Sequence, residues 1–181
     1  MTPPTRLVCA GCGVTPSDDD PYPFRCPNAG KGDVDHVVTR VLNPDGVHFP
    51  AGEAGGVPFV RYRALLHSYH RAVGGGMDDA EFTAMVERLD QAVVAVDGRG
   101  FQATPFRRDD RLSAVLGFAS DGGVWVKDET GNVAGSHKGR HLMGVLLHLE
   151  VVEQLGLVSA AERPDLAEGC WDRDREERGS G

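Results

Sequence analysis

The sequence has no long apolar run and no excess of basic residues. No segment of its 181 residues is long and apolar enough to span a bilayer. The first nine residues contain two prolines and lack the apolar stretch of a signal peptide. The net charge is −8 and the sequence pI is about 5.3, whereas nucleic acids and acidic membranes attract basic surfaces. These absences predict a cytoplasmic protein with neither nucleic acid nor membrane as a partner.

Cysteine is also scarce, with four residues in the chain. In a reducing cytoplasm they are expected to be free thiols or metal ligands rather than disulfides. Cys9 and Cys12 have the spacing at which two thiolates on a tight turn chelate one zinc ion. Cys26 offers a third thiolate, while Cys170 is too remote in the sequence to be preferred.

A closed zinc site needs a fourth ligand, and the second half of the motif has no second cysteine. Position 29 is alanine, so either His36 or Asp33 has to complete the site. The predicted structural metal ligands are Cys9, Cys12, Cys26 and His36. The alternative is a decayed ribbon whose cysteines are free.

Changes in composition divide the chain into three parts. Residues 1–42 form a cysteine-containing leader that ends in an expected strand over 34–42. Residues 43–158 have the alternation of helical and extended patterns expected of an α/β part. Residues 159–181 are a charged tail with few apolar side chains.

A pair of helices is predicted near the start of the α/β part. Residues 59–73 have helical composition, and three glycines then break the helix. Asp78 is expected to cap the next helix, with Glu81 as its capping-box partner. The glycines could be imagined as a phosphate loop, but Asp78 and Asp79 in the following turn would repel a phosphate.

Two strands and a long helix are predicted after this pair. Residues 104–106 are expected to be extended, and strands are expected over 113–119 and 124–127 with a turn over 121–123. The helix that starts near Ser136 is apolar on most sides, which is typical of deep burial.

The first turn of that long helix carries an unusual concentration of cations. Lys138 and Arg140 lie there with His137 and His141, after Ser136 as the expected N-cap. Positive charge is unfavourable at this end of a helix dipole. The pattern indicates either a nearby anion or a lysine that is not a free cation, and the alternative is a solvated basic patch.

This segment resembles a motif of the fold-type-II pyridoxal-phosphate enzymes, which include threonine synthase, threonine dehydratase and cysteine synthase. The matching residues are Val126, Lys127, Asp128, Glu129, Gly135, Ser136, His137, Lys138, Gly139 and Arg140. The Thr-Pro-Phe of 104–106, the Arg-Tyr-Arg of 61–63 and the cysteine-containing leader resemble further elements of threonine synthases.

The resemblance implies a partial fold-type-II (tryptophan synthase β-like) α/β fold. It implies that Lys138 forms a Schiff base with pyridoxal 5'-phosphate, that His137 lies against the cofactor ring and that Ser136 also binds the cofactor. The freed lysine would remove the Cα proton of an amino-acid substrate, leading to β-elimination or to β/γ-replacement.

The family's substrate-carboxylate loop and phosphate loop do not follow Lys138 in this sequence. A fragment or an inactive chain would explain this, but we expect a second polypeptide that supplies both loops and pairs its strands with parallel strands of this chain. The protein is then a lyase or synthase that is active only as a heteromer. The alternative is a non-catalytic zinc-ribbon regulatory or scaffold subunit derived from such an enzyme.

Overall fold

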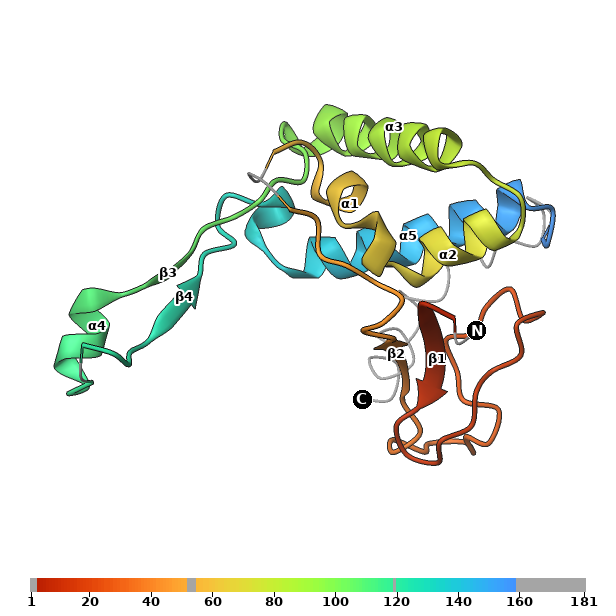
Figure 1. Ribbon diagram of the computed structural model, residues 1–181, viewed down its shortest axis with the longest axis horizontal. Helices are drawn as coiled ribbons and strands as arrows, with labels where there is room; N and C mark the ends of the chain where they lie inside the picture. The colour runs from red at the N-terminus through yellow and green to blue at the C-terminus, as the bar shows by residue number, and fades with distance from the viewer. Residues whose placement is uncertain (1–2, 52–54, 119, 159–181) are drawn as a thin grey trace, which may run out of the picture.

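The computed structural model describes residues 3–51, 55–118 and 120–158, and it shows a mixed α/β chain. Three parts can be followed in Figure 1: the leader, a helical body above it, and an arm that projects from one end of the body. The elements in chain order are β1 (Thr5–Cys9), β2 (Val38–Leu42), α1 (Pro58–Arg61), η1 (Arg63–Leu65), α2 (His67–Gly74), α3 (Asp79–Asp97), β3 (Phe106–Arg108), α4 (Asp110–Val115), β4 (Trp125–Lys127), η2 (Val133–Gly135) and α5 (Lys138–Gln154).

Within the described part of the chain, no helix combines the length and the apolarity needed to cross a membrane. The predicted charged tail, with Cys170, lies outside the described residues.

The leader is a two-stranded antiparallel ribbon with a long loop between its strands. Strand β1 pairs with β2 so that Cys9 lies opposite Val38. The sequence predicted β2, although the strand begins at Val38 rather than at residue 34. It did not predict β1, whose residues were expected to be irregular.

The first predicted helix forms as three short pieces. Helix α1 starts at Pro58, where the missing N–H costs nothing, and η1 and α2 complete the segment. Helix α2 ends at Gly74, and Gly76 adopts a φ of 100°, which favours glycine. The glycines therefore break the helix, as predicted.

Helix α3 confirms the predicted capping box. The side chain of Asp78 accepts a hydrogen bond from the Glu81 N–H, and the Glu81 carboxylate accepts one from the Asp78 N–H, both at 2.8 Å. The helix ends at Gly98, in the left-handed conformation.

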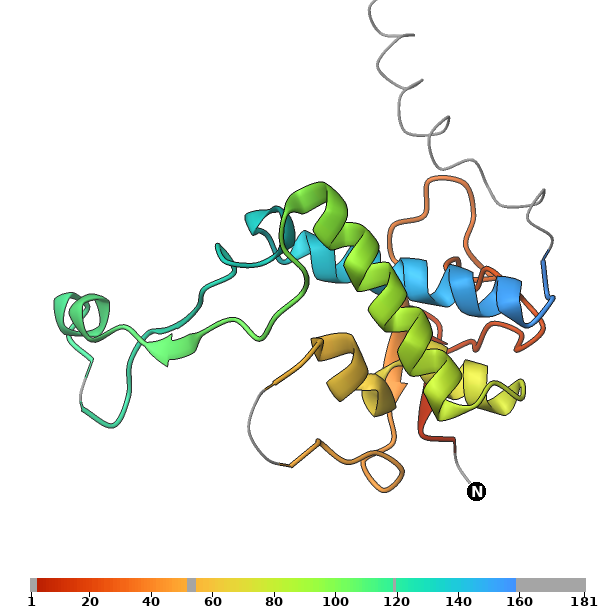
Figure 2. The same ribbon diagram turned by 90° about the horizontal axis from the view of Figure 1, so that it is seen from above.

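The core lies where α3 crosses α5 and α2 (Figure 2). Its buried residues are Phe59, Ala72, Met77, Phe82, Met85, Val86, Leu89, Phe101, Val133, Met143, Leu147 and Val151. The prediction that α5 is buried on most sides was wrong, since Leu142 is 66% exposed. Burial is concentrated on the side that faces α2 and α3.

The arm consists of β3, α4 and β4. Strands β3 and β4 pair antiparallel, with Arg108 opposite Trp125. The strand predicted over 113–119 is wrong, because α4 occupies its first residues. The Asp109 carboxylate caps this helix by accepting a hydrogen bond from the Leu112 N–H at 2.8 Å. The parallel strands expected from the family are also absent among the described residues, where both strand pairs are antiparallel.

Large apolar side chains are exposed along the arm. The rings of Phe106 and Trp125 lie 5.6 Å apart, yet these side chains are 64% and 56% exposed. The other exposed apolar residues of the arm are Leu112, Val115, Leu116, Phe118 and Val126. Concentrated apolar exposure of this kind is typical of an interaction surface.

Candidate metal centre and lysine loop

The leader brings four potential metal ligands together. The ligand atoms of Cys9, Cys12, Cys26 and His36 all lie within 4.8 Å of one another. Cys9 ends β1, and Cys12 lies in the turn closed by the hydrogen bond from the Gly13 N–H to the Cys9 carbonyl. His36 lies two residues before β2, so strand pairing carries it back to this turn. The group can hold a metal ion, as the sequence predicted.

Three distances between ligand atoms of this group are close to those around a tetrahedral ion. The Cys12 and Cys26 sulfurs are 3.6 Å apart, and His36 Nδ1 lies 3.2 Å from the Cys26 sulfur and 3.7 Å from the Cys9 sulfur. A tetrahedron with metal–ligand bonds of about 2.0 to 2.3 Å has edges of roughly 3.3 to 3.8 Å. These three distances are compatible with zinc, and every pair of ligand atoms lies within 4.8 Å.

Neighbouring groups orient these ligands. The Asp33 carboxylate lies 3.4 Å from His36 Nε2, which leaves Nδ1 facing the sulfurs. Asn28 donates its backbone N–H to the Cys26 sulfur and its side-chain amide to the Cys12 sulfur. Of the two candidates for the fourth ligand, His36 thus occupies the ligand position and Asp33 supports it.

A glycine is required inside the cysteine turn. A Cβ atom added at Gly11 would lie 2.3 Å from the carbonyl oxygen of Asp35. The loop before β2 thus approaches the turn too closely for any side chain, and this close approach is what brings His36 to the cysteines.

Two thiols of the group, Cys12 and Cys26, have very different pKa values. The pKa of Cys12 falls to about 6, mainly because the backbone N–H of Val14 donates to its sulfur. Burial raises the pKa of Cys26 to about 11. A metal ion would therefore have to displace a proton from Cys26, which makes its affinity fall as the pH falls.

The second candidate site is the loop between β4 and α5, which carries the predicted cofactor residues Ser136, His137 and Lys138. Lys138 is the first residue of α5, and the side chains of His137 and Lys138 are exposed. The helix cap is His137, without a side-chain cap, rather than the predicted Ser136. Ser136 instead uses its hydroxyl to accept a hydrogen bond of 3.2 Å from the Lys138 N–H.

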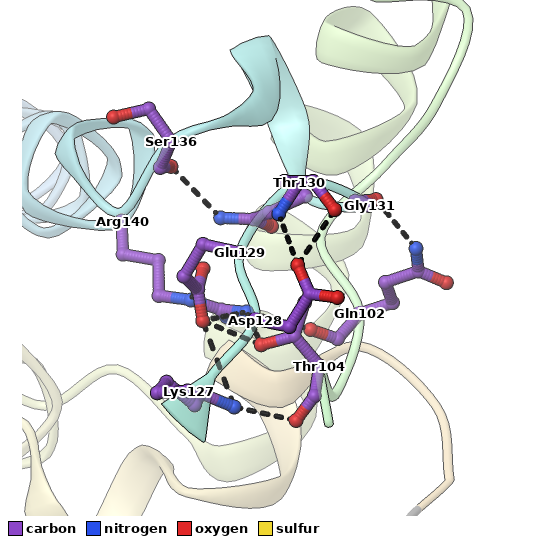
Figure 3. Close-up of polar contacts among 10 residues, drawn as sticks. Gln102, Thr104, Lys127, Asp128, Glu129, Thr130, Gly131, Ser136 and Arg140 are labelled. Atoms are coloured by element: carbon purple, nitrogen blue, oxygen red, sulfur yellow. Dashed lines mark hydrogen bonds and ion pairs between the residues drawn. The ribbon is translucent and has the colours of Figure 1, made fainter. Parts of the chain in front are cut away.

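An ion pair joins the two ends of this loop (Figure 3). Arg140 in α5 donates from Nε to the Glu129 carboxylate at 2.9 Å, and its Nη2 donates to the Gln102 carbonyl at 2.8 Å. The Thr104 hydroxyl donates to the same carboxylate at 2.5 Å. Lys127 donates to the Thr104 carbonyl, also at 2.5 Å. We call Thr104, Glu129 and Arg140 the clamp.

Further contacts hold the loop to the helical body. The Gln102 amide donates to the Gly131 carbonyl at 2.6 Å, and Asp97 at the end of α3 accepts from the Ala134 N–H at 3.2 Å. Ala134 has a φ of 53°, a left-handed conformation that costs a non-glycine residue roughly 1 kcal/mol. Several contacts thus hold a strained backbone just before the lysine.

The sequence identified the lysine segment but not the clamp. Arg140 was noted as a cation of the first helical turn, and Glu129 and Thr104 as parts of segments that resemble the family, but none was assigned a role. Their acid, base and hydroxyl types are compatible with a buried ion pair, but they span 36 positions in the sequence. Nothing in the sequence pattern alone showed that they meet.

We expect Glu129→Gln to destabilise the protein by about 2 kcal/mol, because the substitution removes a charged acceptor from a largely buried ion pair. Hydrogen exchange should accelerate at residues 128–137 more than in α3. Partial burial opposes ionisation of Glu129, but hydrogen bonds from Thr104 and Arg140 hold its pKa below the ordinary value. The contribution of Glu129 to the free energy of unfolding is therefore present at neutral pH. It is lost as acidification protonates the carboxyl group in the folded state.

Chemical denaturation of the original protein and of Glu129→Gln between pH 3 and 7 measures this pH dependence. The variant should lose less stability on acidification. Glu150→Gln is the matched control, because Glu150 is equally buried and pairs with Arg88 on another face. Equal acceleration of exchange in both variants would contradict a specific role of the clamp in ordering the loop.

Comparison with protein-family models, with curated proteins and with solved structures gives no match to this chain. The chemistry of the two sites is therefore inferred from the residues that build them.

Proposed function

We propose that this chain is the lysine-bearing subunit of a heteromeric pyridoxal-phosphate enzyme that catalyses β-elimination or β/γ-replacement on an amino acid. The observation that supports this most directly is the position of Lys138. Its side chain is exposed at the N-terminus of α5, on a loop fixed by the clamp, and the first turn of α5 contains no acid that would pair with it. An immobilised backbone with an accessible amine is the arrangement required of a covalent attachment site.

The residues around Lys138 fit the attachment end of the cofactor. When bound there, the cofactor supplies an aldehyde for the lysine amine and an electron sink for the substrate. Lys138 would first hold the cofactor and, once released, accept the proton from the substrate Cα atom. His137, beside it on the exposed surface, would lie against the ring, and Ser136 keeps the first backbone N–H of α5 engaged.

The arm supports the existence of a partner polypeptide. Strand β4 of the arm leads directly into the lysine loop, and we propose that a protein bound to the exposed apolar face of the arm extends to Lys138. We propose that this partner covers Phe106 and Trp125 with an apolar surface of its own. It would contribute the loops that hold the substrate carboxylate and the cofactor phosphate.

Co-expression with the product of a neighbouring gene that encodes those loops is expected to give a yellow complex active on an amino acid. The chain alone should be colourless, because it lacks a cradle for the phosphate among its described residues. Replacing Trp125 with serine should weaken the complex at least about tenfold, through the loss of a large apolar contact. Size-exclusion chromatography with light scattering and absorbance detection measures both effects.

Val73→Ser is the matched control for that substitution, since Val73 is 46% exposed on α2, outside the arm. It should leave the complex unchanged. A monomer of this chain that binds the cofactor tightly and turns over an amino acid by itself would refute the divided-site proposal.

We also propose that the metal of the leader is a structural zinc ion held by Cys9, Cys12, Cys26 and His36. A set of four protein ligands leaves no position for a substrate, so the ion would stabilise rather than react. Cys9, Cys12 and Cys26 are free thiols in the described residues, so their sulfurs are available to a metal ion.

A second candidate function is a non-catalytic zinc-ribbon scaffold. The Cys3His group is compatible with it, because a scaffold would retain that group for its stability. Covalent labelling of Lys138 by the cofactor separates the two functions, since a scaffold has no use for an accessible lysine on a fixed loop.

A further inference from the structure

A cleft of about 750 Å³ lies between the leader and the helical body. Strand β1 and the loop over residues 15–23 form one wall, and α2 with the end of α5 forms the other. Cavities of about 300 to 1,000 Å³ are typical of small-molecule sites. The cleft contains neither the cysteine group nor Lys138, so it is separate from both sites described above.

The body wall of the cleft carries a positive charge that lacks a partner. Arg71 on α2 lines the cleft, and its Nε atom is buried without a hydrogen-bond acceptor among the described residues. No described carboxylate forms an ion pair with this guanidinium either. Because Arg71 lines the cleft, an oxyanion bound there can pair with its guanidinium group.

Two histidines extend the polar part of this wall. His67 Nδ1 shares a hydrogen bond of 3.1 Å with the buried Thr5 hydroxyl of β1, and His70 Nε2 donates to the Ala64 carbonyl at 2.7 Å. Burial, with a further contribution from His148 and Arg71, lowers the pKa of His67 to about 4. His67 is therefore neutral at neutral pH, and Arg71 remains the principal cation of this wall.

The opposite wall carries two aspartates as well as one cation, Arg6, and two leucines also border the cleft. Asp18 and Asp19 lie on the loop that borders the cleft, and Leu155 and Leu157 border it from the end of α5. A simple anion attracted by Arg71 would be repelled by these carboxylates. A zwitterion can place its carboxylate at Arg71 and its ammonium group at the aspartates.

We propose that this cleft binds a free α-amino acid with an apolar side chain. The carboxylate of the ligand pairs with Arg71, its ammonium group faces Asp18 and Asp19, and its side chain packs against Leu155 and Leu157. Because the cleft joins the leader to the body, the ligand also ties these two parts together. This proposal does not depend on the function proposed for Lys138.

Isothermal titration calorimetry of the full chain with L-leucine and L-methionine tests the proposal. Two half-molecules of leucine, 4-methylpentanoate and 3-methylbutylamine, are the matched ligands. Both amino acids should bind, and each half-molecule should bind at least about tenfold more weakly, because each forms only one of the two charged contacts. Arg71→Gln and Asp18→Asn should each weaken binding of L-leucine.

Arg88→Gln is the control variant, since Arg88 is 59% exposed on α3 and pairs with Glu150 outside the cleft. Thermal unfolding shows whether each variant is folded. If Arg71→Gln does not fold, binding of L-leucine and its half-molecules to Asp18→Asn tests the zwitterion site instead. Equal binding of 4-methylpentanoate and L-leucine, unaffected by Asp18→Asn, would overturn the zwitterion site. Failure of both amino acids to bind at millimolar concentration would overturn the proposal altogether.

Discussion

Lys138→Ala is expected to abolish covalent attachment of the cofactor and to reduce turnover of the heteromeric enzyme by roughly 10³-fold or more. Stability should change little, because the side chain is exposed. The reason for the large effect on activity is that one amine serves twice, first as the attachment point and then as the base. Borohydride reduction of the yellow complex, followed by peptide mapping, locates the attachment.

The mapping is unambiguous because the chain contains only three lysines, Lys31, Lys127 and Lys138. The Lys127 amine donates to the Thr104 carbonyl at 2.5 Å and lies 3.6 Å from Glu129, so it already interacts with two residues of the clamp. Lys31→Ala is the control for an exposed leader lysine and should keep full labelling. A pyridoxyl group on Lys31 or Lys127, in a complex that turns over substrate, would refute the assignment of Lys138.

The parts of the fold that the sequence predicted are those set by local interactions. Asp78 and Glu81 satisfy each other's backbone N–H groups within one turn, so the start of α3 is encoded in four residues. The glycines after α2 act locally in the same way. The Cys-x-x-Cys turn is equally local, which is why the sequence could place Cys9 and Cys12 in one candidate metal site.

The errors in the fold prediction come from segments whose apolar pattern suits more than one structure. Residues 113–119 form a short apolar run that periodicity cannot assign to a strand rather than a helix. The deciding contacts are the Asp109 cap and the hydrogen bond of 2.6 Å from the Ser113 hydroxyl to the Asp109 carbonyl. Similarly, β1 becomes a strand through its pairing with β2, more than 28 residues further along the chain.

In the candidate sites too, the sequence predicted the local features but not those that depend on tertiary contacts. The sequence predicted three sulfur ligands and His36 as the fourth, with Asp33 as the alternative, but it did not show why His36 takes that position. The choice depends on β1–β2 pairing and on the close approach at Gly11, both of which are tertiary features. The clamp and the Arg71 cleft also combine residues from separate elements, so no local pattern reveals them.

Removal of the metal is expected to unfold the leader while leaving the helical body intact. The buried side chains of residues 3–42 are Thr5, Cys9, Pro16, Pro23 and Cys26. Two of these are proposed ligands, and a two-stranded ribbon is at best marginally stable by itself. The body has a separate apolar core around Phe82 and Leu147 that does not include the cysteines. Chelation should therefore abolish hydrogen-exchange protection in β1 and β2 and preserve it in α3.

Substitution of a ligand should also unfold the leader, because it too removes the metal. Cys26→Ser is expected to reduce bound zinc from one ion per chain to near zero, whereas Cys170→Ser should leave one ion bound. Asp33→Asn should weaken zinc binding by roughly 10- to 100-fold, because it disturbs the orientation of His36 without removing a ligand. Elemental analysis and competition with a chromophoric chelator measure both quantities.

Zinc affinity should also fall on acidification, since the high pKa of Cys26 makes protons compete with the metal. Protein purified without chelator that contains almost no metal, yet retains protected β1 and β2 amides, would show that the leader folds without an ion.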